Sequence, residues 1–565
     1  MPLQKLQFQP GINKETTSYS NEGGWFDCDK VRFRQGFPEK IGGWGKIGAK
    51  SFLGSCRALW PWRTLNLDDF LGVGTHLKYY IESGEGYYDV TPIRLTTSAG
   101  DVTFAATNGS STITVSDPTH GAVVNDFVTF SGAVSLGGNI TAAVLNQEYQ
   151  IFEIVDSSTY KIVAREVASI DSITVDGQYS PTPVVADGSD TGNGGSSIVG
   201  TYQVNVGLDT SVTGNGWGAG AWGRSTWGSA ATVDLITDTL RIWTHDNFGE
   251  DLIINDMDGG IYYWDASAVN SLTNPAVAIS DLAGADLAPT VAKKVIVSDV
   301  DRHVIAFGCD PLNNIGVQDP LLIRFSDQES VVDWRPSTTN TAGDLRLGSG
   351  SKIVTAVETR QQILVFTDVS LHALQYIGPP FTFGINMISA NITIRSPISV
   401  AAVQTLPCSV RDYVFSNFNA TQAEKCFAAV NSSFSEIWWY YPSANSGNND
   451  RYVVYNYLQD IWYYGNLTRT AWVDRGVNET PIAAGRDGYL YNHEVGFDDG
   501  STNPASPIVA YIESSQFDIG DGDQFSFVRR LIPDLTFRNS TAETPIANFT
   551  VKARNFPGGA YLQNN

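Results

Sequence analysis

The chain has 565 residues, of which 42% are hydrophobic and 12% aromatic, and its formal net charge is −23. That length allows several domains or one large β architecture, with a hydrophobic core large enough to be stable without disulfides or structural metals. Five widely spaced cysteines without a CxxC pair indicate neither a zinc site nor a disulfide framework and predict buried free thiols in a reducing compartment. We expect neither a signal peptide nor a membrane span, because no long apolar run is present.

The N-terminal residues differ in charge from the rest of the chain. Residues 1–63 carry ten Lys/Arg and five Asp/Glu, a net charge of +5, which leaves −28 on the remainder. Residues 1–97 are interpreted as a docking segment with the first propeller strands. The basic side chains of Arg32, Arg34 and Lys40 are candidates for a face that docks on an acidic neighbour, such as another copy of the chain. A solvated basic face is the alternative interpretation.

Residues 98–170 change character. Short β-prone runs there are separated by Gly, Asn, Asp and Ser, a pattern typical of a small β-sandwich inserted as a separate domain. A linker and loop rich in Gly and Trp follows at 171–230. Its Trp217, Trp222 and Trp227 are five residues apart, a spacing that fits neither a helix face nor a strand face. These indoles either pack on their own domain or line a subunit interface or channel, so they are candidates for a gate.

The main body, residues 231–510, is predicted to be a β-propeller. In Gln361–Gly384 a β-branched run, a turn and a second strand precede Pro379-Pro380, which cannot continue a ladder. Related hairpins are expected at 251–265, 411–418, 436–442 and 451–465, and such repetition is typical of propeller blades. The fold class is therefore all-β: a β-propeller-like subunit with an inserted small β-sandwich domain.

The remaining residues, 511–565, are expected to form C-terminal strands. Within them, Asn548–Arg554 (NFTVKAR) reads as a strand without a following partner. Either an earlier strand caps this edge or further chain completes the sheet.

No chemical motif is present that would predict catalysis. The sequence has no HExxH, GxSxG, Walker or dinucleotide-binding pattern, and its six histidines are isolated. The Asp-rich stretches 255–259 and 518–523 lack the distal Glu of a calcium loop and fit hairpin turns instead. Phe325–Trp334 is the nearest approach to a sialidase Asp box and does not match it. We therefore predict no catalytic residue, no metal ligand, no cofactor and no enzymatic activity.

Several stretches together resemble the tail nozzle (tail hub) proteins of short-tailed, podovirus-type bacteriophages, the group that includes tail tubular protein B and the packaged-DNA stabilisation hub. The stretches that carry the resemblance are Pro10–Trp25, Val31–Trp44, Arg324–Trp334, Ile363–Phe383 and Phe517–Arg530. They extend over most of the chain except the expected sandwich. The resemblance supplies no catalytic residues.

The resemblance implies a structural virion protein, assembled in the cytoplasm of the host bacterium. It implies a homohexameric ring below the tail adaptor and portal, with tail fibres or spikes as neighbours. Packaged duplex DNA would be retained and then ejected through the lumen without tight binding, which suits an acidic body. Two alternatives remain: a carbohydrate-binding phage adhesin with exposed Trp and Tyr, and a propeller glycosidase. Glycan binding by a monomer favours the first and turnover of a glycoside the second.

Overall fold

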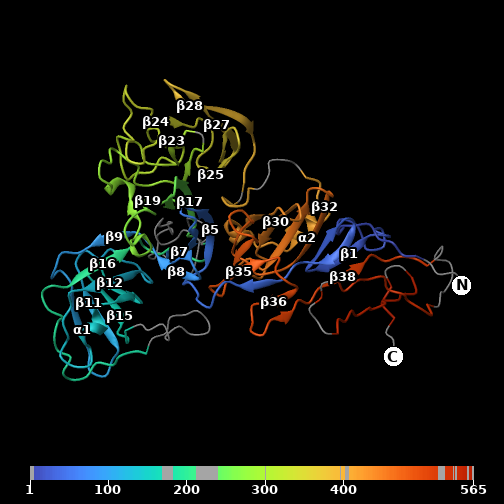
Figure 1. Ribbon diagram of the computed structural model, residues 1–565, viewed down its shortest axis with the longest axis horizontal. Coiled ribbons are helices and arrows are strands. Elements are labelled where there is room, and N and C mark those ends of the chain that lie inside the picture. The colour runs from blue at the N-terminus through green and yellow to red at the C-terminus, as the bar shows by residue number, and fades with distance from the viewer. Residues whose placement is uncertain are drawn as a thin grey trace, which may run out of the picture. The chain divides into compact units, whose positions relative to one another are not determined.

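The computed structural model describes residues 5–167, 182–211, 240–299, 301–394, 396–400, 406–519, 528–538, 540, 544–556 and 559–562. Strands dominate these residues (Figure 1). The short helical segments among them are α1 (Ala142–Leu145), α2 (Arg411–Ser416), η2 (Ser271–Thr273), η3 (Ile279–Asp281) and η4 (Ala420–Lys425). The all-β prediction is confirmed. None of the described helices has the length and apolar character to cross a membrane.

Contacts divide the chain into two compact units. Unit 1 comprises Met1–Ile47, Ser399–Ala483 and Leu490–Asn565, and unit 2 comprises Gly48–Ile398 and Ala484–Tyr489. Each unit joins segments that are far apart in the sequence, so neither follows from a simple cut of the chain.

Unit 2 contains four antiparallel sheets, each built from four strands in chain order. The first consists of β5 (Cys56–Arg63), β6 (Asp69–Thr75), β7 (Tyr79–Ser83) and β8 (Gly86–Asp89). The second consists of β17 (Trp243–Phe248), β18 (Asp251–Asp256), β19 (Ile261–Trp264) and β20 (Val277–Ala278). The third consists of β21 (Lys294–Val297), β22 (Val304–Phe307), β23 (Leu322–Phe325) and β24 (Gly343–Arg346). The fourth consists of β25 (Ile353–Glu358), β26 (Ile363–Thr367), β27 (Ser370–Gly378) and β28 (Thr382–Ala390). A four-stranded sheet in chain order is the strand pattern of a propeller blade.

These sheets pack face to face through aromatic and β-branched side chains. Trp62 and Trp264 meet edge-to-face between the first and second sheets, with ring centroids 6.2 Å apart. Phe325 and Phe383 do the same between the third and fourth sheets, at 4.9 Å. The first strands lie beside one another, because β5 contacts β17, β17 contacts β21, and β21 contacts β25. Full burial of one such side chain contributes about 2 kcal/mol.

A β-sandwich lies within unit 2, between β8 and β17 in the sequence. One sheet has the order β10 (Thr103–Ala106), β11 (Thr112–Ser116), β15 (Thr159–Val163), β14 (Glu153–Asp156). The other has the order β13 (Glu148–Gln150), β12 (Phe127–Ser131), β16 (Val199–Gln203), β9 (Ile93–Thr96). The expected range 98–170 leaves out β9 and β16, since a Gly- and Ser-rich stretch separates β16 from the other strands. Phe104 and Phe130 pack edge-to-face in the sandwich core, at 5.0 Å.

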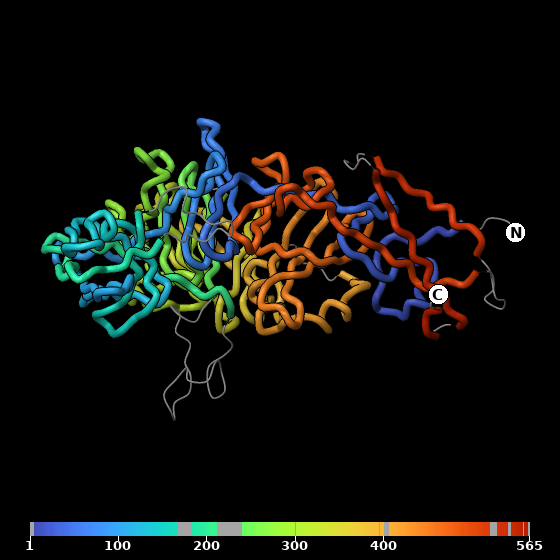
Figure 2. Tube along the Cα trace, turned by 90° about the horizontal axis from the view of Figure 1, so that it is seen from below, coloured from blue at the N-terminus to red at the C-terminus, as the bar shows by residue number. Residues whose placement is uncertain are grey.

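Unit 1 combines the two ends of the described chain. Its four-stranded sheet consists of β29 (Phe427–Asn431), β30 (Glu436–Tyr441), β31 (Arg451–Asn456) and β32 (Ile461–Asn466). A six-stranded sheet has the order β33 (Ala471–Val473), β34 (Ile482–Ala484), β35 (Leu490–His493), β4 (Trp44–Lys46), β36 (Asp498–Gly500), β37 (Ser506–Pro507). The remaining pairs are β1 (Trp25–Asp29) with β38 (Tyr511–Ser514), and β2 (Val31–Arg34) with β3 (Phe37–Lys40). Figure 2 shows N-terminal chain in blue beside C-terminal chain in red in this unit.

The hairpin predicted at Gln361–Gly384 is confirmed, with β26 and β27 as its strands and the two prolines between β27 and β28. One other prediction was wrong. The stretch 411–418 begins with helix α2, where the Tyr413 ring stacks on Tyr464 at 4.5 Å, so a tertiary contact overrides β propensity. Asn548–Arg554 is extended and joins no strand ladder among the described residues, so its pairing in a sheet stays a prediction.

Candidate functional site

The first strands of three neighbouring sheets in unit 2 bring five titratable groups together. We call His245, Asp246, Lys294, Asp299 and Glu358 the hub cluster. His245 and Asp246 lie on β17, Lys294 begins β21, Asp299 follows β21, and Glu358 ends β25. Each of these strands is an edge of its own sheet among the described residues, so its outer backbone groups need other partners.

The carboxylates of the hub cluster satisfy that need. Asp246 Oδ2 accepts a hydrogen bond from the backbone N–H of Val297 at 2.8 Å. Glu358 Oε1 accepts one from the backbone N–H of Asp299 at 3.1 Å. Lys294 Nζ donates to Thr355 Oγ1 at 3.4 Å. Asp246 of β17 and Glu358 of β25 therefore both cap backbone N–H groups in or directly after β21. These hydrogen bonds join β17 to β21 and β21 to β25.

Burial displaces the pKa values of Asp246, Glu358, Lys294 and His245. It raises the pKa of Asp246 to about 6 and that of Glu358 to about 7, against the hydrogen bonds that favour the carboxylates. It lowers the pKa of Lys294 to about 8, with Asp246 opposing the shift. Burial, together with the positive charge of Lys294, lowers the pKa of His245 to about 3. Charge in the cluster thus changes between pH 6 and 8.

Groups with pKa values near neutrality are also what general acid–base catalysis requires. Here both carboxylates are occupied as backbone caps, and the His245 ring packs against Trp60 at 5.1 Å. Within the described ranges, no group of three or more His, Cys, Asp or Glu side chains is placed to hold a metal ion. A cavity of about 180 Å³, lined in part by Arg94 and Tyr262, does not include the hub cluster and is smaller than ordinary ligand pockets. The geometry favours a structural role for the cluster.

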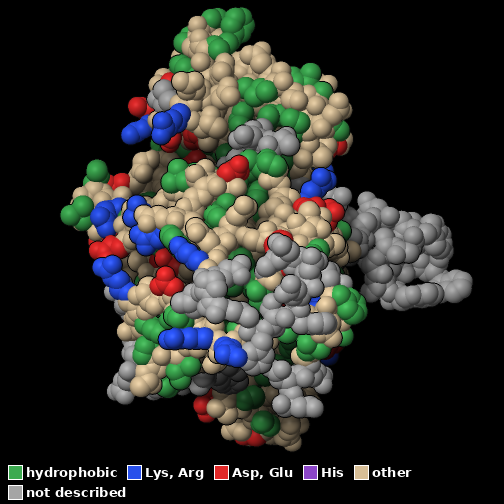
Figure 3. Space-filling model, turned by 90° about the vertical axis from the view of Figure 1, so that its right-hand side faces the viewer, with side chains coloured by type: hydrophobic (Ala, Val, Ile, Leu, Met, Phe, Trp, Pro, Cys, Tyr) green, Lys and Arg blue, Asp and Glu red, His purple; other side chains and the backbone are tan. Residues whose placement is uncertain are grey.

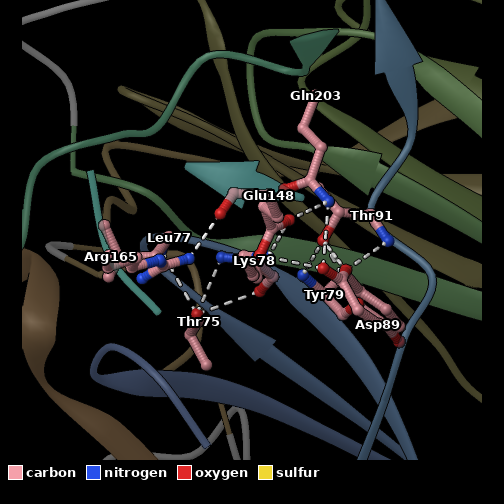
Figure 4. A network of polar contacts seen from close by, with 9 residues as sticks. All are labelled: Thr75, Leu77, Lys78, Tyr79, Asp89, Thr91, Glu148, Arg165 and Gln203. Carbon is pink, nitrogen blue, oxygen red and sulfur yellow. Dashed lines mark hydrogen bonds and ion pairs between the residues drawn. The ribbon is translucent and has the colours of Figure 1, made fainter. Parts of the chain in front are cut away.

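A second polar network, the sandwich joint, connects the first sheet of unit 2 to the sandwich (Figure 4). Lys78 Nζ donates to Asp89 Oδ2 and to Glu148 Oε1, both at 2.6 Å. Gln203 Nε2 donates to the same two oxygens, at 2.9 and 3.2 Å. Asp89 belongs to β8, whereas Glu148 and Gln203 belong to β13 and β16 of the sandwich. The buried ammonium of Lys78 therefore connects one sheet of the sandwich to the first sheet of unit 2.

The Lys78 side chain stays protonated although it is buried. Burial alone would lower the pKa of Lys78, but the carboxylates of Asp89 and Glu148 raise it above its ordinary value. The ammonium also lies 4.2 Å from the centroid of the Phe127 ring on β12. Its side chain is only 3% exposed, so removing either acid would leave a buried charge poorly paired.

The structure corrects the role expected for Arg32. Its side chain is 1% exposed and forms a bidentate pair with Glu436 on β30, with Nε–Oε1 and Nη2–Oε2 distances of 2.9 and 3.0 Å. It also donates to both carboxylate oxygens of Glu494, at 2.8 and 2.6 Å. The guanidinium lies 3.6 Å from the centroid of the Phe434 ring. Arg32 is therefore an internal tie of unit 1 and presents no charge for docking.

The other candidates have different outcomes. Arg34 is exposed, and Lys40 Nζ donates to the backbone carbonyl of Phe497 at 2.6 Å. A docking role for these two residues stays a prediction. Trp217, Trp222 and Trp227 lie outside the described residues. All five cysteines are free, as expected, although Cys408 and Cys426 are only partly buried.

Sequence reasoning missed both the hub cluster and the sandwich joint. The available signal was a run of four polar residues, Thr244-His245-Asp246-Asn247, between the aromatic residues Trp243 and Phe248 of one strand. A polar run in a buried strand needs hydrogen-bond partners, and the partners here come from other sheets. Neither Glu148 nor Gln203 has a comparable local signal.

Comparisons with known proteins add little. No family model and no curated protein matches the chain. Among solved structures, phage phi92 endosialidase is 10% identical, and the match covers 98% of this chain and 84% of that chain. The TM-score is 0.18, so the two backbones do not superpose, and nothing about function follows from this likeness.

Proposed function

We propose that the chain is a structural protein of a phage tail, and more specifically the tail nozzle of a short-tailed phage. In this proposal, copies form a ring below the adaptor and portal that retains packaged DNA and then lets it leave. The resemblance of five sequence stretches motivates the assignment. The observation that carries it is the distribution of charge between buried ion pairs and the rest of the chain.

Several Arg and Lys side chains form ion pairs in the interior of the fold. Arg32 and Lys78 pair internally while nearly unexposed, and Arg57 and Arg241 likewise pair with Asp209 and Asp256. These four cations pair with six carboxylates, so the ion pairs account for only −2 of the formal net charge of −23, and the remaining −21 lies on other residues. An acidic wall repels the phosphates of duplex DNA, so DNA can slide past it without sticking. Figure 3 shows that Asp and Glu side chains reach the surface between groups of Lys and Arg.

The first test is light scattering on purified protein, followed by negative-stain imaging of the same fraction. A ring near six times the chain mass of 61.3 kDa, with a central channel, supports the nozzle. The same sample should show no binding to duplex DNA at physiological salt. A particle that stays a single chain, both alone and with its adaptor, and that binds glycans on an array would support an adhesin instead.

A further inference from the structure

The outermost strand of the fourth sheet in unit 2 differs from those of the other three. β8 and β24 have four residues each and β20 has two, and β24 carries both Asp344 and Arg346. β28 has nine residues, Thr382–Ala390, with no charged side chain. Natural proteins usually shorten, charge or cover such edges, because a long uncharged edge is a template for another strand. β28 is neither short nor charged, and no described strand covers it, although its pairing with β27 shifts register where Leu371 and His372 face Ser389 and Met387.

The hairpin formed by β27 and β28, both labelled in Figure 1, carries five exposed large apolar side chains. Those on β27, on the turn and on β28 are Tyr376, Ile377, Phe381, Met387 and Ile388, with exposed fractions of 39, 56, 74, 56 and 50%. Single exposed apolar residues are ordinary, but a group on one hairpin marks an interaction site. Among the described residues, no strand pairs with the outer edge of β28.

The chain also contains a strand-like segment that has no ladder. In Asn548–Arg554, Phe549, Val551 and Ala553 alternate with polar Thr550, Lys552 and Arg554. Phe549 is 53% exposed and Val551 is 65% exposed. Strict alternation over seven residues is the pattern of a half-buried strand, yet no sheet among the described residues contains it. One sequence thus supplies both an open edge and a strand suited to such an edge.

We propose that Asn548–Arg554 of one copy adds to β28 of a second copy as a fifth strand. Backbone hydrogen bonds would supply affinity, and Phe549 and Val551 would meet the exposed apolar side chains of the hairpin. Within its own chain, Lys552 Nζ pairs with Glu513 Oε2 at 2.6 Å, and the Arg554 guanidinium lies 3.8 Å from the centroid of the Tyr561 ring. Arg554 would bring positive charge to a neighbour whose formal net charge is −23, which reduces repulsion between copies. β28 has no charge of its own that would oppose it.

The contact is heterologous, since two different surfaces meet. A heterologous contact repeated from copy to copy closes into a ring or continues as a filament. The inference rests on the proposed function to this extent: both require copies to associate. It adds the identity of the two surfaces that form the subunit contact.

Cysteine cross-linking between two single variants tests the pairing. Ser389→Cys is placed on β28 and Thr550→Cys on the segment, each in a separate preparation of the full chain. After oxidation we expect a species of twice the chain mass in the mixture, and not in either preparation alone, which also controls for the native cysteines. Thr550→Cys mixed with Ser337→Cys, at another exposed site, is the matched control. No cross-link in the mixture, or an equal one with Ser337→Cys, would overturn the proposal.

A second variant measures how much β28 contributes to the free energy of self-association. Met387→Lys combined with Ile388→Lys should raise the Kd of self-association at least about tenfold, because pairing would bring ammonium groups to the apolar contact. Val369→Lys, at a 44% exposed turn position of the same sheet, should leave it unchanged. Circular dichroism confirms folding of each variant. Rings that form unchanged in the double variant would overturn this inference while leaving the nozzle assignment intact, whereas a wild-type chain that never associates would contradict both.

Discussion

Replacing Arg32 by leucine should destabilise unit 1 severely. The variant removes the cation that pairs with both Glu436 and Glu494, whose side chains are 0 and 14% exposed. Breaking a buried pair by removing one partner costs about 3–5 kcal/mol, since the other charge stays buried without compensation. Here two carboxylates lose their partner, so the upper part of that range is expected. Charge reversal at this position would therefore test folding rather than docking.

The pH dependence of the loss gives an independent check. Burial already raises the pKa of Glu436 above its ordinary 4.5, although Arg32 and hydrogen bonds from Tyr463 and Trp438 oppose the shift. Without Arg32 the folded-state pKa of Glu436 rises further. A carboxyl with a raised folded-state pKa contributes stability that is complete below its unfolded pKa and lost as the pH rises through its folded pKa. The deficit of the variant should therefore be largest at neutral pH and shrink towards pH 4.5.

Hydrogen exchange of the β2 and β30 amides, combined with urea unfolding, is the appropriate assay, because a chain with two units need not unfold in one step. Arg34→Leu is the matched control. It removes the same kind of side chain two positions along the same strand, where it is exposed, and should change stability by no more than about 0.5 kcal/mol. A loss below about 1 kcal/mol for Arg32→Leu, or a loss that does not vary with pH, would refute the reasoning.

Three further predictions follow from the other sites. Asp246→Asn should flatten the pH dependence of unfolding, because folding raises the pKa of Asp246 from 3.8 to about 6. The variant should match the stability of the wild type below pH 3.8 and exceed it by up to about 3 kcal/mol above pH 6. Urea titration at several pH values measures the difference. Glu148→Gln should speed hydrogen exchange at β13 and cost about 1.5–3 kcal/mol, because the buried Lys78 ammonium loses one of two carboxylates and keeps Asp89; unchanged exchange would contradict the sandwich joint. Deleting Gly214–Gly228, which includes the three tryptophans, should leave rings intact in electron micrographs but let assembled particles leak DNA; full retention would remove this loop from the mechanism.

Local pattern was enough to predict the class of the fold. Alternating β-branched and aromatic runs separated by Gly and Asp specify strands and turns through short-range sterics and propensity, as the hairpin at Gln361–Gly384 illustrates. The same reasoning failed at Arg411–Ser416. There the stacking of Tyr413 on Tyr464 stabilises a helix in a segment of β-prone residues. Propensity is a weak preference, and one long-range contact can reverse it.

The use of each charged residue was decided by long-range contacts. Arg32 and Arg34 look equivalent in an alternating strand, yet one lies between Glu436 and Glu494 and the other is exposed. Partners some 400 residues away in the sequence decide which arginine is buried. The free energy of such a pair depends on desolvation and geometry, and neither is encoded in the neighbouring residues.

The amino-acid sequence alone thus determined that this protein is built from β-hairpins, because the period-two pattern of side chains and the chemistry of turns are local properties. Tertiary structure alone decided that Asp246 and Glu358 cap neighbouring sheets, that Lys78 joins the sandwich to its host sheet, and that β28 has no outer strand partner in the described part of the chain. Each of these depends on which strand ends beside which, and strand neighbours are set by packing of the whole unit.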